Sequence, residues 1–184
     1  MAYTVSNMLP LGTVAPDFTL LDTVSGKIKS LSDIQSDKAT VIIFSCNHCP
    51  FVHFVNDEMI RIAKEYQAKG VAFAAISCND IAAYPQDAPD KMTIFAKESG
   101  YTFPYLYDET QAIGRAYDAA CTPDFYVFDS TMKLAYRGQM DSARPSNGKQ
   151  PTGSDLRAAI DSVLSGQPVA ERQYPSGGCG IKWK

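Results

Sequence analysis

Two cysteines separated by two residues, Cys46 and Cys49, constrain this chain more than any other feature of its sequence. They follow an apolar run over residues 39–45 and precede an amphipathic segment over 50–66 that has helical periodicity. Two thiols at a strand-to-helix junction can close a small disulfide ring. A thiol at a helix N-terminus is also favoured as the thiolate, which is its reactive form. We therefore expect dithiol–disulfide chemistry, with Cys46 at the helix N-terminus as the nucleophile.

A metal site is the main alternative interpretation of this motif. Zinc would need a second pair of ligands, but Cys78, Cys121 and Cys179 each stand alone in the sequence. Both histidines, His48 and His53, lie within a few residues of the motif. We expect no metal and no cofactor, and we keep a metallochaperone that uses the two motif cysteines and a histidine as a rival class.

The bulk properties indicate one globular domain over residues 1–184. Hydrophobic residues make up 45% of the chain and charged residues 20%, which is ordinary for a globular protein. A net charge of −3 gives no reason to expect nucleic acid or an anionic membrane as a partner. No secretory signal is visible in the first residues, and five cysteines is an odd number. We therefore expect a catalytic role for the cysteine pair and a cytoplasmic location.

Apolar strand-like runs alternate with helix-like periodic segments, which predicts an α/β architecture. Ser154 is the expected N-cap of the last helix, and the stretches 82–89 and 142–153 are expected loops. The tail over 173–184 is expected to be mobile or to dock on the body. The predicted strands cover 39–45, 71–77, 125–129 and 134–137, and the predicted helices cover 50–66, 90–99, a segment from about Asp108, and 154–164.

Four motifs carry a resemblance to a known family: the segment Gly12–Leu20, the cysteine pair, Cys121-Thr122-Pro123, and a tail that ends in Gly-Cys-Gly-Ile-Lys-Trp. The chain resembles the thioredoxin-fold superfamily in its alkyl hydroperoxide reductase/thiol-specific antioxidant branch, and within it the peroxiredoxin-like thioredoxin family proteins. The resemblance implies a central mixed sheet flanked by helices, an N-terminal hairpin extension and a C-terminal tail. It also implies a cis peptide bond before Pro123, beside which the Thr122 backbone pairs with an extended substrate.

Two departures from the family patterns bear on activity. Peroxiredoxins place a threonine or serine three residues before the peroxide-reducing cysteine, whereas Cys46 occupies that position relative to Cys49. The hydroxyl that holds the peroxide is thus replaced by a thiol, and we expect peroxidase activity to be impaired. Thioredoxins carry a buried acid six residues before the first cysteine, where this chain has Thr40, and the sequence identifies no replacement.

The expected chemistry is thiol–disulfide exchange. Cys46 attacks a target disulfide and Cys49 then resolves the mixed disulfide. His48 lies between them and is expected to stabilise the thiolate, the alternative being a solvent-exposed residue without effect. Cys121 is either a packing residue or an auxiliary thiol. Cys179 is either a free thiol or a third redox centre on a flexible, glycine-rich tether.

The sequence therefore predicts a thiol–disulfide oxidoreductase that acts on disulfide-containing proteins or small thiols, as a possible homodimer and without nucleic acid or membrane partners. The enzymatic alternative is an antioxidant thiol peroxidase that uses Cys49, with Cys46 as the resolving thiol. The reducing partner and the direction of electron flow do not follow from the residues.

Overall fold

The computed structural model describes residues 3–184, whose main sheet has seven strands in the order β3-β2-β6-β5-β4-β8-β9. The central strand β4 runs parallel to β5 and antiparallel to β8, so the sheet is mixed, as predicted. The hairpin β2–β3 forms one edge. The strands are β2 (Thr19–Asp22), β3 (Lys27–Ser30), β4 (Ala39–Phe44), β5 (Ala72–Ser77), β6 (Tyr105–Tyr107), β8 (Asp124–Asp129) and β9 (Leu134–Gly138).

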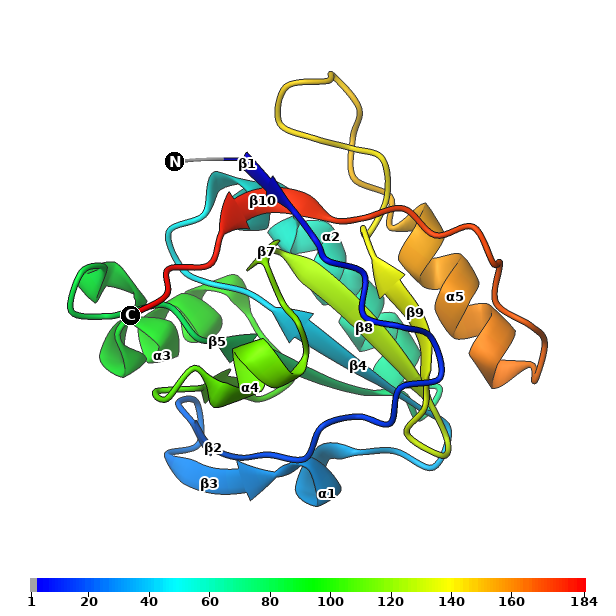
Figure 1. The fold of residues 1–184 in the computed structure, drawn as a ribbon, viewed down its shortest axis with the longest axis horizontal. Helices are drawn as coiled ribbons and strands as arrows, with labels where there is room; N and C mark the ends of the chain where they lie inside the picture. Colours follow the sequence, from blue (N-terminus) through cyan, green and yellow to red (C-terminus); the bar gives the residue numbers. More distant parts are fainter. Residues whose placement is uncertain (1–2) are drawn as a thin grey trace.

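Helices cover both faces of this sheet, which confirms the predicted α/β class (Figure 1). One face packs against α2 (Pro50–Gln67), α3 (Pro89–Ser99) and α5 (Ser154–Leu164), and the other against α1 (Leu31–Ile34) and α4 (Ala112–Ala116). A short 3₁₀ helix, η1 (Pro85–Asp87), precedes α3. None of the helices in residues 3–184 is long and apolar enough to cross a membrane.

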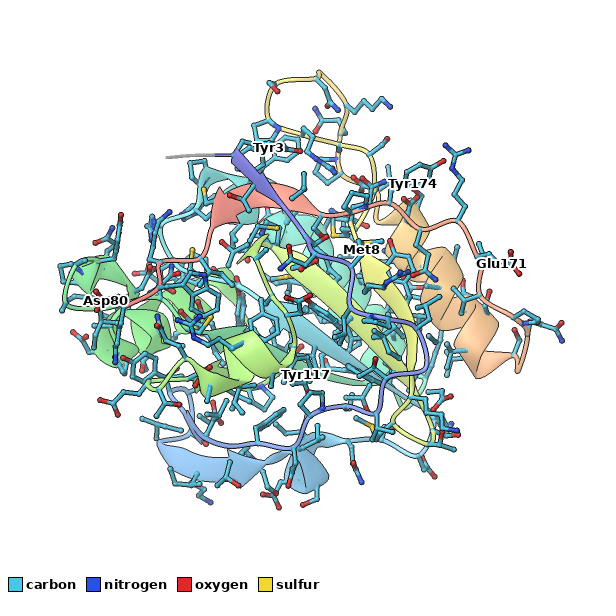
Figure 2. The ribbon with its side chains drawn as sticks, in the orientation of Figure 1. Tyr3, Met8, Asp80, Tyr117, Glu171 and Tyr174 are labelled. Carbon is cyan, nitrogen blue, oxygen red and sulfur yellow. The ribbon has the colours of Figure 1, made fainter. Side chains whose placement is uncertain are left out.

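Strand β4 lies at the centre of the core, and all six of its residues are buried. Successive side chains of a strand point to opposite faces of the sheet. Val41 and Ile43 accordingly pack under α2 and α5, whereas Ile42 and Phe44 pack in the cluster on the opposite face. Side chains fill the space between the layers (Figure 2). The loop that leaves β4 therefore starts from a strand that is fixed on both sides.

Two predicted helix starts are wrong. Ser154 is the first residue of α5, not its N-cap, because Gly153 caps the helix with a φ of 66°, in the left-handed region that glycine adopts readily. A Cβ at Gly153 would also lie 2.2 Å from Ile62 Cδ1. The helix predicted from about Asp108 begins at Ala112, because the Asp108 carboxylate accepts the backbone N–H of Gly114.

The C-terminal tail is docked as part of a second sheet, in which β10 (Gly177–Gly180) lies between β1 (Tyr3–Val5) and β7 (Cys121–Thr122) (Figure 1). Both pairings of β10 are antiparallel. The three glycines of β10 serve close packing, not flexibility as the sequence analysis expected. A Cβ at Gly178 would lie 2.0 Å from the carbonyl oxygen of Thr122, and one at Gly177 would lie 2.0 Å from the hydroxyl of Tyr3.

The residues after β10 also bind the body of the protein. The backbone N–H of Ile181 donates to Ala120 O at 3.0 Å, and Lys182 O accepts the backbone N–H of Asp80 at 2.8 Å. The guanidinium of Arg115 lies 4.4 Å from the ring centroid of Trp183. Contacts on both sides of Cys179 thus hold the tail in place.

Candidate active site

The helix that follows the two cysteines begins at Pro50, as the sequence predicts, so Cys46 lies outside it. α2 starts at Pro50 with Cys49 as its N-cap, and Cys46 lies in the preceding loop. Proline favours this start because it lacks a backbone N–H and fits the first turn, where that N–H would have no helical partner. The prediction that Cys46 occupies the helix N-terminus is therefore wrong. Cys49 holds the position that the helix dipole makes favourable for an anion.

A buried carboxylate holds the loop between the two cysteines. Asp87 Oδ1 accepts the backbone N–H of Asn47 at 2.8 Å, and its Oδ2 lies 2.6 Å from Nδ1 of His48. Oδ2 also accepts the side-chain amide of Asn79 at 2.8 Å. Residues 82–89 are predicted as a loop, and nothing in the sequence distinguishes Asp87 from a solvent-exposed loop aspartate.

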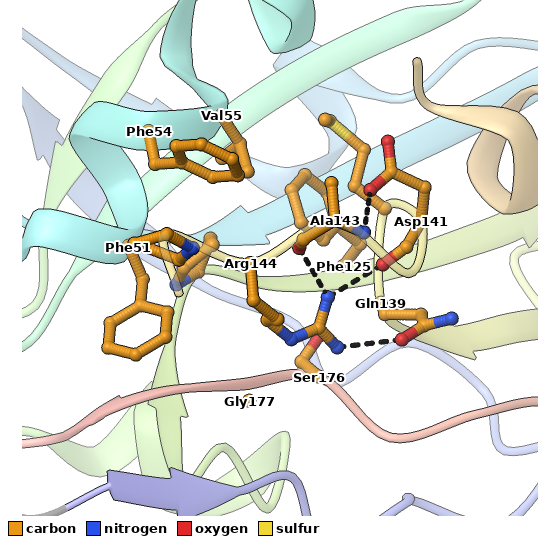
Figure 3. A pocket seen from close by; sticks show the side chains of 13 residues that line it. Phe51, Phe54, Val55, Phe125, Gln139, Asp141, Ala143, Arg144, Ser176 and Gly177 are labelled. Carbon is orange, nitrogen blue, oxygen red and sulfur yellow. Dashed lines mark hydrogen bonds between the residues drawn. The ribbon is translucent and has the colours of Figure 1, made fainter. Parts of the chain in front are cut away.

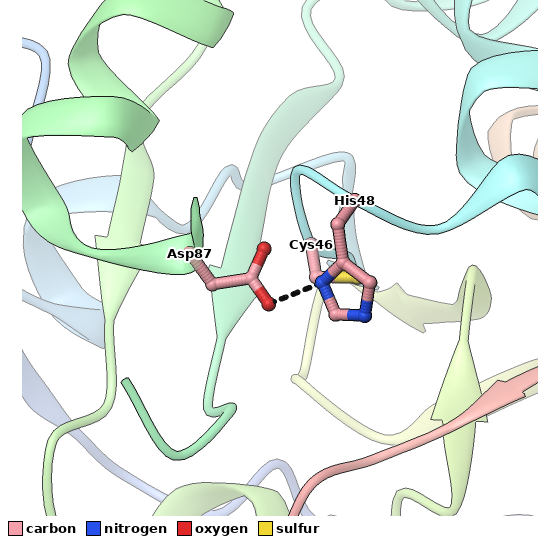
Figure 4. A group of neighbouring side chains, drawn as sticks. All are labelled: Cys46, His48 and Asp87. Atoms are coloured by element: carbon pink, nitrogen blue, oxygen red, sulfur yellow. Dashed lines mark hydrogen bonds and ion pairs between the residues drawn. The ribbon is translucent and has the colours of Figure 1, made fainter. Parts of the chain in front are cut away.

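The imidazole of His48 lies between this carboxylate and a thiol (Figure 4). Ligand atoms of Cys46, His48 and Asp87 all lie within 4.8 Å of one another, and no other such set occurs among residues 3–184. The ring stacks on Tyr84 with 5.4 Å between centroids, and its Nε2 is buried without a hydrogen-bond partner. These three groups are the ones that could hold a metal ion, although Nδ1 is already hydrogen bonded to the carboxylate.

The residues just before β8, Thr122 at the end of β7 and Pro123, form a second part of the site beside the cysteines. The peptide bond between Thr122 and Pro123 is cis, as the family resemblance implies. The hydroxyl of Thr122 lies 3.3 Å from Cys46 Sγ, and its carbonyl oxygen accepts a hydrogen bond from the Cys49 thiol at 3.2 Å. The fold thus places two motifs that are more than 70 residues apart in direct contact.

A third thiol completes this cluster. Cys179 pairs with Thr122 across the β10–β7 ladder. It is buried in one apolar group with Cys46, Cys49 and Val52. The exposed fraction is 1% for Cys46 and 0% for Cys49, so β10 and its neighbours seal the motif from solvent.

The hydrogen bonds of the cluster favour the thiolate on Cys49. They lower the pKa of Cys49 to about 5, although burial acts in the opposite direction. The Cys46 thiol has the largest effect, followed by the Cys179 thiol and the backbone N–H groups of Val52 and Cys179. The pKa of Cys46 is raised because its proton is held by Cys49, and because burial and the Asp87 carboxylate disfavour a second anion. The neighbouring thiols and the position at the start of α2 thus lower the pKa of Cys49, whereas the hydrogen bond from its thiol to the Thr122 carbonyl oxygen favours the protonated form.

The other two cysteines are packed in the interior. Burial raises the pKa of both Cys78 and Cys121. Cys121 lies next to Thr122 in β7, and the charges of Asp124 and Cys49 raise its pKa further. The Sγ of Cys78 would lie 2.8 Å from a Cβ at Gly114, so it fills space there as a small apolar side chain.

Two further polar residues support the site. His53 Nε2 lies 2.7 Å from the carbonyl oxygen of Asn47, so this histidine braces the loop between the cysteines. Asp124 follows the cis-proline directly and is buried, which raises the pKa of its carboxyl to about 7. Its Oδ2 accepts the hydroxyl of Tyr126 at 3.0 Å. Asp124 is thus a buried acid on β8. The corresponding acid of thioredoxins would lie at the position of Thr40, on β4.

A cavity of about 20 Å³ lies beside the cis-proline, lined by Phe51 and Gly177 among others (Figure 3). This volume is enough for about one water molecule. The guanidinium of Arg144 projects into it but donates to Asp141 O and to Gln139 Oε1, each at 2.7 Å. These bonds fix the arginine within the loop that follows β9.

The chain belongs to the AhpC/TSA family, which its residues 11–137 match. It is similar along its length to two solved structures. An uncharacterized conserved protein from Geobacillus kaustophilus is 55% identical over 100% of this chain and 97% of its own, with a TM-score of 0.99. A hypothetical protein from Sinorhizobium meliloti 1021 is 44% identical over 98% of both chains, with a TM-score of 0.95.

A more distant neighbour shows the fold alone. The thioredoxin domain of a thiol-disulfide oxidoreductase from Bacteroides vulgatus is 16% identical over 83% of this chain and 99% of its own, with a TM-score of 0.63. No curated protein matches the sequence. The protein is thus a thioredoxin-fold member of the AhpC/TSA family with a thiol-based redox function.

Proposed function

We propose that this protein is a thiol–disulfide oxidoreductase in which Cys46 and Cys49 cycle between dithiol and disulfide. The observation that carries the proposal is the position of Cys49 at the start of α2, where hydrogen bonds lower its pKa to about 5. The second thiol of the pair lies beside it and provides its largest stabilising hydrogen bond. A low-pKa thiolate with an adjacent thiol is the equipment that disulfide exchange requires.

The exchange runs in two steps. The Cys49 thiolate attacks one sulfur of a target disulfide, forms a mixed disulfide and releases the other sulfur as a thiolate. Cys46 then attacks the Cys49 sulfur, closes the Cys46–Cys49 disulfide and releases the reduced target, while its proton passes to the leaving thiolate. The roles of the two cysteines are thus the reverse of those that the sequence predicts. His48, held by Asp87, favours the anionic dithiol electrostatically.

Thiol peroxidase activity is the second candidate, and the same position of Cys49 favours it. Attack of the thiolate on a peroxide would give a sulfenic acid, which would condense with Cys46 to the same disulfide and release water. The Cys46 thiol contacts the Cys49 sulfur where peroxiredoxins place a hydroxyl. The candidates therefore differ in the oxidant that enters the site.

We propose small thiols and disulfide-containing proteins as the partners, and the cytoplasm as the location. All five cysteines are unpaired in the structure, which suits a reducing compartment. We further propose that no metal or cofactor takes part. We propose a homodimer, which sedimentation of the purified protein tests.

Parallel turnover assays test the function. Reduced protein is given glutathione disulfide, insulin disulfides or hydrogen peroxide, and Cys49→Ser, Cys46→Ser and Cys78→Ala are compared with the wild type. We expect disulfide reduction that Cys49→Ser abolishes, a mixed disulfide that accumulates when Cys46→Ser is combined with Cys179→Ser, and normal rates in Cys78→Ala. Faster consumption of peroxide than of any disulfide would favour the peroxidase. Inactivity with all three oxidants would refute a redox function of the pair.

A further inference from the structure

The strand β10 occupies an edge that an extended substrate would otherwise use. Peptides commonly bind by adding a strand to an open sheet edge, where main-chain hydrogen bonds hold them. The edge beside the sulfurs belongs to β7, and its residue Thr122 contacts both motif cysteines. In this protein Cys179 pairs with Thr122 in antiparallel register, followed by Gly180 with Cys121. The chain therefore fills its own substrate position, and it places a cysteine there.

The close fit of β10 shows that this placement is built into the sequence. Gly178 directly precedes Cys179, and any side chain there would collide with the Thr122 carbonyl, a rigid backbone group. Gly180 follows Cys179, and a Cβ there would lie 2.7 Å from Thr4 Oγ1. Position 178 must therefore be glycine for the strand to lie between β1 and β7, and a side chain at position 180 would require Thr4 to move.

Cys179 is buried in the same apolar group as Cys49. Its thiol and its backbone N–H both lower the pKa of Cys49. Cys49 thus has a thiol partner on each side: Cys46 from the loop before α2 and Cys179 from β10. Anchors on both sides of β10, described above, hold the third thiol in this position.

We propose that Cys179 is an internal substrate thiol, and that the disulfide formed between Cys46 and Cys49 passes to Cys49 and Cys179. The inference rests on the proposed function, which supplies the Cys46–Cys49 disulfide. Cys179 gives up its proton and its thiolate attacks the Cys49 sulfur, the Cys46–Cys49 bond breaks as the Cys49–Cys179 bond forms, and Cys46 leaves as a thiolate that takes up the released proton. One disulfide is exchanged for another, so no external oxidant or reductant is consumed.

The charge state of the site favours this transfer after oxidation. In the reduced protein burial, the hydrogen bond to Cys49 and the negative charge of Cys49 raise the pKa of Cys179 to about 12, which keeps it a thiol. Oxidation of Cys49 removes the last two causes, while Lys182 still lowers the pKa. Cys179 therefore ionises more readily when Cys49 is in a disulfide than when Cys49 is a thiolate.

Disulfide mapping tests the transfer. Reduced full-length protein is oxidised with glutathione disulfide, quenched in acid, alkylated and digested without reduction. We expect peptides for both the Cys46–Cys49 and the Cys49–Cys179 disulfides. The amount of the Cys49–Cys179 peptide should be at least about a tenth of that of the Cys46–Cys49 peptide, which means that the two disulfide isomers differ in free energy by no more than about 1.4 kcal/mol. The ratio should not change with protein concentration, because both bonds lie within one chain.

Variants separate this inference from the proposed function. Gly178→Ala keeps all five thiols but pushes β10 away from Thr122, so we expect at least a tenfold loss of the Cys49–Cys179 peptide. Cys46→Ser should form Cys49–Cys179 as its main disulfide, and Cys78→Ala should match the wild type. A wild type with Cys46–Cys49 alone, together with a Cys46→Ser that forms no Cys49–Cys179 bond, would overturn the inference and leave the function intact. Absence of the Cys46–Cys49 disulfide would instead refute the function.

Discussion

The Cys46→Ala variant gives the most direct test of which sulfur is activated. The pKa of Cys49 is lowered from 9.0 to about 5, which favours the anion on this sulfur. The Cys46 thiol makes the largest contribution. A hydrogen bond to a charged group contributes about 1.5–3 kcal/mol, so its loss should raise the pKa of Cys49 by about one to two units.

Ultraviolet absorbance of the thiolate in reduced protein measures this change as a function of pH. The wild type should show one transition near pH 5, Cys46→Ala should shift it upward by about one to two units, and Cys78→Ala should leave it in place. Alkylation and peptide mapping along the same series identify the cysteine that ionises. A transition that stays near pH 5 in Cys46→Ala, or one that maps to Cys46 in the wild type, would refute the assignment of the thiolate to Cys49.

Three further predictions follow from the same structure. His48→Ala removes the imidazole beside Cys46 and should shift the reduction potential to more negative values, by about 30 mV for each ~1.4 kcal/mol lost, as read by glutathione titration. Burial raises the pKa of the Asp124 carboxyl from 3.8 to about 7. The contribution of this residue to the free energy of unfolding is therefore largest below pH ~4 and is lost as the pH rises through ~7. Urea unfolding should show a loss of about 4 kcal/mol over this interval that Asp124→Asn lacks. Gly153→Ala should cost about 1–3 kcal/mol by the same assay, because of its positive φ and its approach to Ile62; an unchanged midpoint would contradict this.

Elements whose structure depends on local pattern could be predicted from the sequence. The apolar run predicted over 39–45 forms β4, and the periodic segment predicted over 50–66 forms α2. Both elements are long, and their patterns agree with their burial. Pro50 at the first helical position fixes the start of α2, as predicted, but the cysteine that caps the helix was misassigned, because a cysteine pair carries no signal that favours Cys49 over Cys46 as the N-cap.

The polar contacts of the site could not be predicted, because they join segments that are distant in sequence. Asp87 comes from η1, 38 to 41 residues beyond the motif that it holds. The buried Asp124 is recognisable only once β8 is placed in the core of the sheet. In the sequence the glycines around Cys179 indicate a flexible segment. In the structure they allow β10 to pack closely against the two strands that flank it.

The buried position of the thiols and the low pKa of Cys49 have a common origin. Burial alone would raise a thiol pKa, as it does for Cys78. At Cys49 the donors outweigh burial, and two of them, the thiol and the backbone N–H of Cys179, come from β10. The strand that covers the site is thus also part of what activates it. Any event that removes β10 would take away these two donors, which raises the pKa of Cys49, and would also expose Cys49 to solvent, which lowers it, so access and activation are coupled through the same strand.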